Sequence, residues 1–241
     1  MKNIYKYLLI PSILIFSLSF CNNKQEKESN KNSAQQDQES NQQTINQDGI
    51  LYKLDMSAGN TEVNWIGYKT NEKTAVSGSF SEFSSDRENQ SFNSIDDLVD
   101  GLNFSISSLS SSSGDPIRDL NLKDYFFKYL TDNFEIEGTL GRPTNDSIDV
   151  SFNILGQDQT VRFAYSTYLT TSKYSNKIIQ IKGKLNLVNQ FNREAFNSIH
   201  KQCFDLHKGS DGISKTWEEV DVDIKVLVIN ETNPKFHKIK H

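Results

Sequence analysis

Cysteine is scarce in this sequence of 241 residues, which contains only Cys21 and Cys203. Because Cys21 lies in an N-terminal leader segment, the rest of the chain can form no internal disulfide, and the fold must depend on an apolar core. A basic surplus is also lacking, since the net charge is −5, so nucleic acid is not expected as a partner. The sequence has no Gly-x-Ser-x-Gly motif, phosphate loop or His-Glu-x-x-His motif. We therefore predict that the protein is not an enzyme.

The first 21 residues have the composition of an export signal. Two lysines precede an apolar run over residues 7–20, which is shorter than the roughly 20 apolar residues that a membrane-spanning helix needs. A charged start, a short apolar run and an abrupt change to polar residues are typical of a secretion signal. The run ends in Leu18-Ser19-Phe20-Cys21, which resembles the lipobox of bacterial lipoproteins. We predict a lipoprotein signal peptide over residues 1–21 with lipid attachment at Cys21; the alternative is an ordinary signal peptide cleaved nearby.

Two terminal segments are predicted to stay unfolded. Residues 22–49 consist mainly of Asn, Gln, Ser, Lys and Glu, so they cannot bury enough apolar surface to offset the entropy of ordering. A flexible coil of that length reaches about 30 Å, which suits a polar tether behind a membrane anchor. The basic tail, residues 233–241, is predicted to be flexible as well. The protein is therefore expected in the cell envelope, lipid-anchored to a bacterial membrane, with its domain in the periplasm or at the cell surface.

Between these segments, residues 50–232 form one predicted domain in which apolar residues recur with a period of two. Such alternation is typical of strands with one buried face and one solvated face. Turn residues separate the strands, for example at 141–146 and 156–158. The pattern favours an antiparallel up-and-down barrel or a sandwich. Eight alternating segments carry it: Val63–Trp65, Val76–Phe80, Leu102–Ile106, Phe134–Leu140, Ile148–Ile154, Val161–Tyr165, Ile179–Leu187 and Val220–Val228.

Three short helices are expected among the strands. The first begins at the capping residue Ser94 and stops at Gly101, and the others cover residues 121–130 and 192–207. In the last helix, His200, Cys203 and His207 lie along one side, a spacing that could present nitrogen and sulfur to a metal. Cys203 also falls on the apolar stripe, where a free cysteine behaves as a small apolar residue. We therefore predict no metal site. The serine-rich run 107–114 is expected to be a flexible connector.

The order of these segments resembles the YceI-like family, lipocalin-like barrels exported to the periplasm whose characterised members bind polyisoprenoids. The resemblance spans about residues 55 to 230, and no single motif carries it alone. It implies an all-β fold, namely an eight-stranded antiparallel lipocalin-like β-barrel with a few short helices. The matching segments are Asn60-Thr61-Glu62-Val63-Asn64-Trp65-Ile66-Gly67, Val76-Ser77-Gly78-Ser79-Phe80, Arg118-Asp119-Leu120 with Asp124-Tyr125-Phe126-Phe127, Asn153-Ile154-Leu155-Gly156 with Val161, and Glu218-Glu219-Val220.

The inward faces of the predicted strands mix bulky rings with glycines, which suits either an elongated apolar pocket or a filled core. The resemblance favours the pocket and implies a long apolar lipid, polyisoprenoid-like, held in the barrel as carrier or store. The alternative is a scaffold lipoprotein with a filled barrel and protein partners. No other cofactor is expected, and pairing of two copies as a homodimer is left open. Gly183→Leu is expected to abolish lipid retention without unfolding. The predicted lining residues are Trp65, Phe80, Phe104, Phe126, Phe152, Phe163, Tyr165, Ile181 and Gly183.

Overall fold

Eleven antiparallel strands pair into a single sheet in the computed structural model, which describes residues 49–57, 59–171 and 175–232. The predicted signal peptide with Cys21, the tether up to residue 48 and the tail lie outside the described residues. Within the described residues, no helix has both the length and the apolar content that a membrane span requires. The strands are β1 (Tyr52–Asp55), β2 (Thr61–Lys69), β3 (Thr74–Phe80), β4 (Phe83–Ser85), β5 (Asn103–Ser107), β6 (Ser111–Ser112), β7 (Glu135–Leu140), β8 (Ser147–Ile154), β9 (Gln157–Leu169), β10 (Lys177–Asn186) and β11 (Glu219–Asn230).

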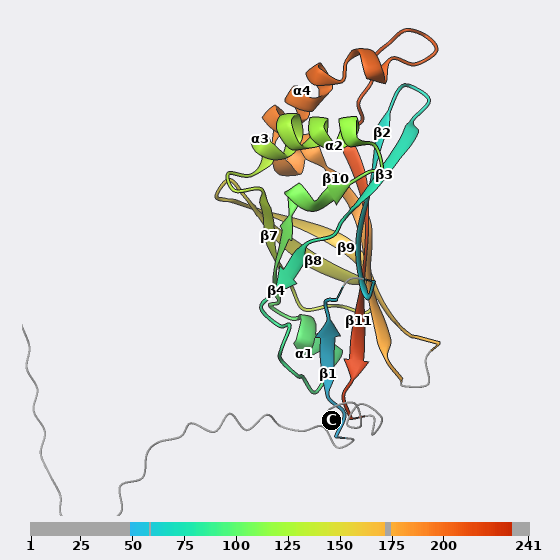
Figure 1. The fold of residues 1–241 in the computed structure, drawn as a ribbon. Helices are drawn as coiled ribbons and strands as arrows, with labels where there is room; N and C mark the ends of the chain where they lie inside the picture. The colour runs from blue at the N-terminus through green and yellow to red at the C-terminus, as the bar shows by residue number, and fades with distance from the viewer. Residues whose placement is uncertain (1–48, 58, 172–174, 233–241) are drawn as a thin grey trace, which may run out of the picture. The chain divides into compact units, whose positions relative to one another are not determined.

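The sheet is strongly curled. Its order is β4-β5-β7-β8-β9-β10-β11-β2-β3-β6, and β1 pairs with β11 off this path. β4 stands at one end of the order and β3 lies next to the other end, yet only Ser81 and Glu82 separate these two strands in the chain. The N–H of Ser107 donates to the carbonyl of Glu82, so this junction stays hydrogen-bonded to β5. The two ends of the sheet order are thereby brought together around a common interior (Figure 1).

Each of the eight predicted segments corresponds to a strand, but the count of eight strands is wrong. The three additional strands are β1, β4 and β6. They have four, three and two residues, which is too short for alternation to emerge from the sequence. They exist because longer strands offer them backbone partners: β1 pairs with β11, β4 with β5 and β6 with β3. Sequence alternation reports burial of a face and does not report such pairing.

The two faces of the sheet differ as the alternation predicts. In the β10–β11 pair, Ile181 is opposite Ile224 and both point to the interior. The next residues along the strands point outward, where Lys182 forms an ion pair with Asp223 at 3.1 Å. Lys184 and Asp221 repeat this pairing at 2.7 Å. The apolar residues therefore stabilise the interior by burial, while these exposed pairs contribute little to stability.

Helix α1 (Ile95–Val99) lies beside β1 at one end of the sheet (Figure 1). As predicted, the Ser94 side chain caps it by accepting a hydrogen bond from the N–H of Asp97 at 3.1 Å. The helix buries Leu98 and Val99, which are 0% and 1% exposed. They belong to the same core cluster as the interior residues of β8, β9 and β10. This end of the sheet interior is therefore filled with side chains.

The remaining helices gather at the opposite end, close to the β2–β3 hairpin (Figure 1). Helix α2 (Pro116–Leu122) begins five residues earlier than predicted, because Asp115 caps it and Pro116 suits its first turn. It continues through a π-helical turn, Lys123–Phe127, into α3 (Lys128–Leu130). A second π-helical turn, Leu187–Phe191, precedes α4 (Arg193–Gln202), which ends before the predicted residue 207, and Asp205–His207 form a 3-10 turn. These elements cover one end of the curled sheet.

The serine-rich run 107–114 is more ordered than a flexible connector. Residues Ser108–Ser110 form a 3-10 turn, and β6 follows directly. Ser108 is 1% exposed, and its hydroxyl donates to the carbonyl of Phe134 at 2.8 Å. Buried hydroxyls need such partners, because an unsatisfied one is costly. The expectation of a flexible connector was wrong because composition alone does not reveal a buried acceptor.

Candidate functional site

A cavity of about 430 Å³ lies between the helices and the interior face of the sheet. Its lining is mostly apolar and comes from segments far apart in the chain. The helical side includes Leu122 and Phe126, and the sheet side includes Ile136, Leu185 and Val222. Ligand pockets in proteins typically have volumes of about 300–1,000 Å³ and mostly apolar walls. The cavity therefore has the size and chemistry of a site for an apolar ligand.

The mouth of the cavity is marked by apolar side chains that remain exposed. Ile117 on α2 and Leu206 after α4 both line the cavity, and they are 71% and 60% exposed. At the inner end, the lining residues Phe127 and Phe152 are 5% and 9% exposed. The cavity thus leads from a solvated rim between the helices to buried aromatic rings. An apolar chain entering at the rim would lose contact with water along its length.

The π-helical turn Lys123–Phe127 places two consecutive phenylalanines against the cavity. Its widened hydrogen bond runs from the N–H of Lys128 to the carbonyl of Lys123, five residues back. Phe126 and Phe127 are both buried, and their ring centroids are 5.2 Å apart. In a regular helix the side chains of neighbouring residues diverge by about 100°, so consecutive residues point in different directions. Single π-helical turns are frequent at functional sites, and here one of them supplies much of the helical wall.

The structure divides the nine residues predicted to contact a lipid into two groups. Those on the cavity wall are Trp65, Phe80, Phe126 and Phe152. Those outside it are Phe104, Phe163, Tyr165, Ile181 and Gly183, of which Phe163, Tyr165 and Ile181 belong to the filled core. Phe163, Tyr165 and Ile181 fill the interior where they lie, and Gly183, although opposite Val222 of the cavity wall, is covered by the Phe163 ring. The sequence showed which residues face inward but not where along the interior the space lies.

Three of the four inward glycines are covered by aromatic rings. The rings are Trp65 over Gly78, Phe104 over Gly138 and Phe163 over Gly183. A β-carbon at Gly183 would lie 2.4 Å from Cδ1 of Phe163, so a larger residue there must displace a buried ring. Gly183→Leu is therefore expected to destabilise the fold, in contrast to the expectation from sequence. Gly67 differs, because it lines the cavity and a β-carbon there would meet nothing within 4 Å.

Polar groups collect at one part of the cavity rim. Lys69 at the end of β2, His207, and Thr216 in the loop before β11 all line the cavity. The Thr216 hydroxyl lies 2.7 Å from Nδ1 of His207 and 2.9 Å from Nδ1 of His200. Burial, followed by the charges of Lys69 and His200, lowers the pKa of His207 to about 4. His207 is therefore uncharged near pH 7.

The His200, Cys203 and His207 trio does not form a metal site in the described part of the chain. No group of three or more histidine, cysteine, aspartate or glutamate side chains is arranged there to hold an ion. Both histidine rings instead hydrogen-bond to Thr216. Cys203 is buried among apolar neighbours, and burial raises the pKa of its thiol. Lys69 was missed from the sequence because it is far from this helix in the chain, and Thr216 was missed because a single threonine in a loop gives no sequence signal.

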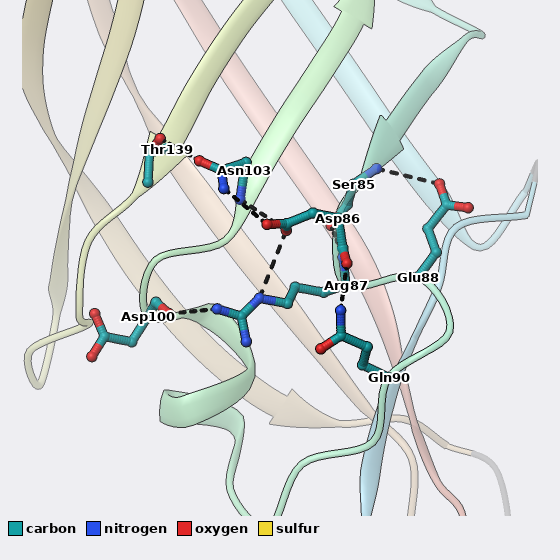
Figure 2. Close-up of polar contacts among 8 residues, drawn as sticks. All are labelled: Ser85, Asp86, Arg87, Glu88, Gln90, Asp100, Asn103 and Thr139. Atoms are coloured by element: carbon teal, nitrogen blue, oxygen red, sulfur yellow. Dashed lines mark hydrogen bonds and ion pairs between the residues drawn. The ribbon is translucent and has the colours of Figure 1, made fainter. Parts of the chain in front are cut away.

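A second hollow, of about 560 Å³, lies over β4, β5, β7 and β8 and is lined mostly by polar residues. Asp86 is one of the lining residues. The Asp86 carboxylate accepts hydrogen bonds from the backbone N–H and the side chain of Asn103 at 3.0 and 2.8 Å (Figure 2). Arg87 contacts Asp86 and donates to the carbonyl of Asp100 (Figure 2). Thr139 donates to Asn103 at 2.7 Å. Because these groups satisfy one another, this network fixes the 86–103 connection.

The structure resembles several solved proteins at low sequence identity. A polyisoprenoid-binding domain from Saccharophagus degradans, implicated in plant cell wall breakdown, is 12% identical with a TM-score of 0.52, covering 74% of this chain and 98% of that one. Burkholderia cenocepacia BcnA is 14% identical with a TM-score of 0.47, covering 73% and 99%. The Campylobacter jejuni YCEI protein is 16% identical with a TM-score of 0.45, covering 64% and 84%.

The sequence matches no protein-family model, and no curated protein matches it. The structural likeness nevertheless confirms, at the level of the fold, the resemblance inferred from the segment order. At these identities the likeness establishes the fold. The Saccharophagus degradans domain has a TM-score above 0.5, and the likeness in fold is taken from this domain.

Proposed function

We propose that this protein, which has the fold of a polyisoprenoid-binding domain, binds a long apolar chain in the cavity under its helices. The observation that carries the proposal is the cavity itself, with exposed apolar residues at its rim and buried rings at its inner end. The curled sheet would act as a lipocalin-like barrel around the inner part of the ligand. The protein would serve as a carrier or store of this lipid and would not transform it.

Burial of a chain in this cavity has a favourable energy. Each methylene removed from water contributes about 0.8 kcal/mol. About ten buried methylenes would therefore contribute roughly 8 kcal/mol, which offsets much of the entropic cost of association. Because the end near α1 is filled by Leu98, Val99 and their neighbours, the chain would occupy only the helical half of the interior. A long polyisoprenoid would then leave part of its length outside the rim.

The alternative function is a scaffold lipoprotein that uses its surface for protein contacts. The filled half of the interior favours it, since Ile148, Phe163 and Tyr165 leave no room for a ligand there. The cavity at the other end is the feature that a pure scaffold would not require. Packing in protein interiors normally leaves few voids larger than a water molecule. We therefore place lipid binding ahead of the scaffold function.

Native mass spectrometry tests the proposal directly. The full chain would be extracted from membranes with a mild detergent, and bound small molecules would be identified after release. We expect a stoichiometric adduct of one long-chain lipid. The delipidated protein should then bind a fluorescent polyene chain with one site per molecule. If every preparation has the apo mass and no polyene chain binds, apolar-chain binding is refuted.

The cellular location is part of the proposal. We propose that Cys21 carries the lipid anchor and that residues 22–49 connect it to the folded domain, which would place the cavity near a bacterial membrane. Membrane attachment through two or more acyl chains is firm, whereas one chain gives only marginal binding. Cys21→Ala should release the protein into the soluble fraction while leaving binding of a polyene chain unchanged. Retention of this variant on the membrane would contradict the anchor.

A further inference from the structure

Lys69 is a cationic side chain on an otherwise mostly apolar wall. It is the last residue of β2, and its side chain lines the cavity and is partly buried. The backbone on both sides is fixed, because Lys69 pairs with Thr74 of β3 and forms a bridge with Thr216. Among the residues that the structure describes, its ammonium group takes part in no ion pair. Lysines are rarely buried without a partner.

The nearest acidic side chain on the cavity wall already has partners. The Asp115 carboxylate accepts hydrogen bonds from the N–H groups of Arg118 and Ile117 at 3.1 and 3.0 Å, as the cap of α2. It also forms an ion pair with the Arg118 guanidinium at 3.4 Å. The N–H of Arg118 in particular holds the pKa of Asp115 below its ordinary value, so the carboxylate stays charged and engaged.

The polar groups at the rim leave one positive charge in excess, because Lys69 and Arg118 share Asp115 as the one carboxylate of the cavity lining. His207 is neutral near pH 7 because of its lowered pKa, and Thr216 is uncharged. Arg118 also lines the cavity and forms the ion pair with Asp115. The guanidinium has five N–H donors, of which Asp115 and the carbonyl of Ser113 engage only some. The rim therefore has one net positive charge and spare donors beside an apolar cavity.

We propose that Lys69 binds an anionic head group, a carboxylate or a phosphate, on the apolar chain that the cavity holds. The inference rests on the proposed function and specifies its ligand as an acidic amphiphile. The tail would lie along Phe126 and Phe152, and the head would stop at Lys69, with Arg118 beside it. An ion pair at a partly desolvated rim is stronger than one in open water. An apolar chain with an uncharged head would leave the ammonium group unpaired.

Three ligands with the same tail isolate the head group: hexadecanoate, hexadecyl phosphate and hexadecanol. Each would be titrated by calorimetry into the delipidated full chain, with wild-type protein and the variants Lys69→Met and Lys69→Arg. We expect the wild type to bind the two acids at least tenfold more tightly than the alcohol. Lys69→Met should remove this preference and leave affinity for the alcohol unchanged, while Lys69→Arg should retain it. Lys182→Met, which removes an exposed lysine paired with Asp223, is the matched control.

The outcomes separate the two proposals. If none of the three ligands binds to the wild type, the proposed function fails. If all three bind equally well, or if Lys69→Met keeps the preference for acids, the cavity binds chains but the head-group site is refuted. Inorganic phosphate is added as a competitor in a further experiment. If it displaces hexadecyl phosphate when both are at the same concentration, the site binds free anions and not a lipid head group. A second readout needs no variant: added salt should weaken binding of the acids by screening and leave the alcohol unaffected.

Discussion

Filling the cavity from Gly67 is the sharpest perturbation of the proposed site. Gly67 lies on β2 between Trp65 and Lys69 and faces the cavity with them. A β-carbon built there meets no atom within 4 Å, and the backbone has no positive φ that would exclude a side chain. In Gly67→Leu, the leucine side chain should therefore enter the cavity without moving the sheet. It would occupy space that the apolar chain needs.

The size of the expected loss of affinity follows from the volume that the leucine side chain takes from the ligand. A leucine side chain replaces about four methylene-sized groups of ligand, which at about 0.8 kcal/mol each amounts to roughly 3 kcal/mol. Affinity for the chain should therefore fall about 100-fold, at roughly 1.4 kcal/mol for each tenfold change. The free energy of unfolding should rise by about 1 kcal/mol, because glycine in a strand costs about 0.5–1 kcal/mol relative to alanine. Loss of binding together with greater stability is the expected signature.

Two measurements test this expectation. Fluorescence titration of the delipidated protein with a polyene chain gives the affinity, and urea denaturation gives the free energy of unfolding. Gly183→Leu is the matched control, because its side chain must displace Phe163 and should cost about 1–3 kcal/mol of stability or more. If Gly67→Leu binds the chain as tightly as the wild type, the ligand does not occupy this cavity and the reasoning is wrong.

Three further predictions concern the rim and the core. Cys203 should react slowly with iodoacetamide in the native state, because its thiol is buried with a raised pKa, and a bound chain should slow the reaction further. Peptide mapping would measure the labelling rate, and labelling of the native protein as fast as in urea would contradict the prediction. His207 has a folded-state pKa of about 4, below its ordinary 6.5, so its contribution is fully present above pH 6.5 and is lost as the pH falls toward 4. Between pH 7.5 and 5, the wild type should lose about 1–2 kcal/mol more stability than His207→Gln in urea melts, after allowance for screening at this partly exposed side chain; equal losses would show that His207 is not perturbed. Ile148→Ala, in the filled half, should cost about 2–4 kcal/mol of stability while leaving polyene affinity unchanged, and a parallel loss of affinity would place the ligand lower in the interior.

The longer elements of the fold were predictable because their causes are local. Alternation along β8 and β11 reflects a buried face and a solvated face, and it is written in successive residues. The caps at Ser94 and Asn192 are equally local, since each side chain bonds to an N–H two or three residues ahead. The short strands β1, β4 and β6 were not predictable, because distant backbone partners create them.

The candidate site was predictable only in part. Trp65 and Phe152 were identified as inward residues and do line the cavity, whereas Phe163 and Tyr165 were identified by the same reasoning and pack in the core. Whether a side chain points inward or outward is set by the pleat of the strand, so the sequence specifies it. How far an inward residue lies from the filled end depends on how α1 inserts Leu98 into the interior. The sequence around the cavity-lining residues does not show this insertion.

The sequence by itself determined a mainly β chain with apolar inward faces, capped helices and the resemblance that pointed to a lipid ligand. The tertiary structure alone decided that one half of the interior is solid and the other hollow, and that Lys69 meets Thr216 and His207 at the rim. The physical reason is that a void is a difference between the space that the elements enclose and the volume of all the side chains that enter it. Such a difference depends on contacts between distant residues, and no local pattern contains it.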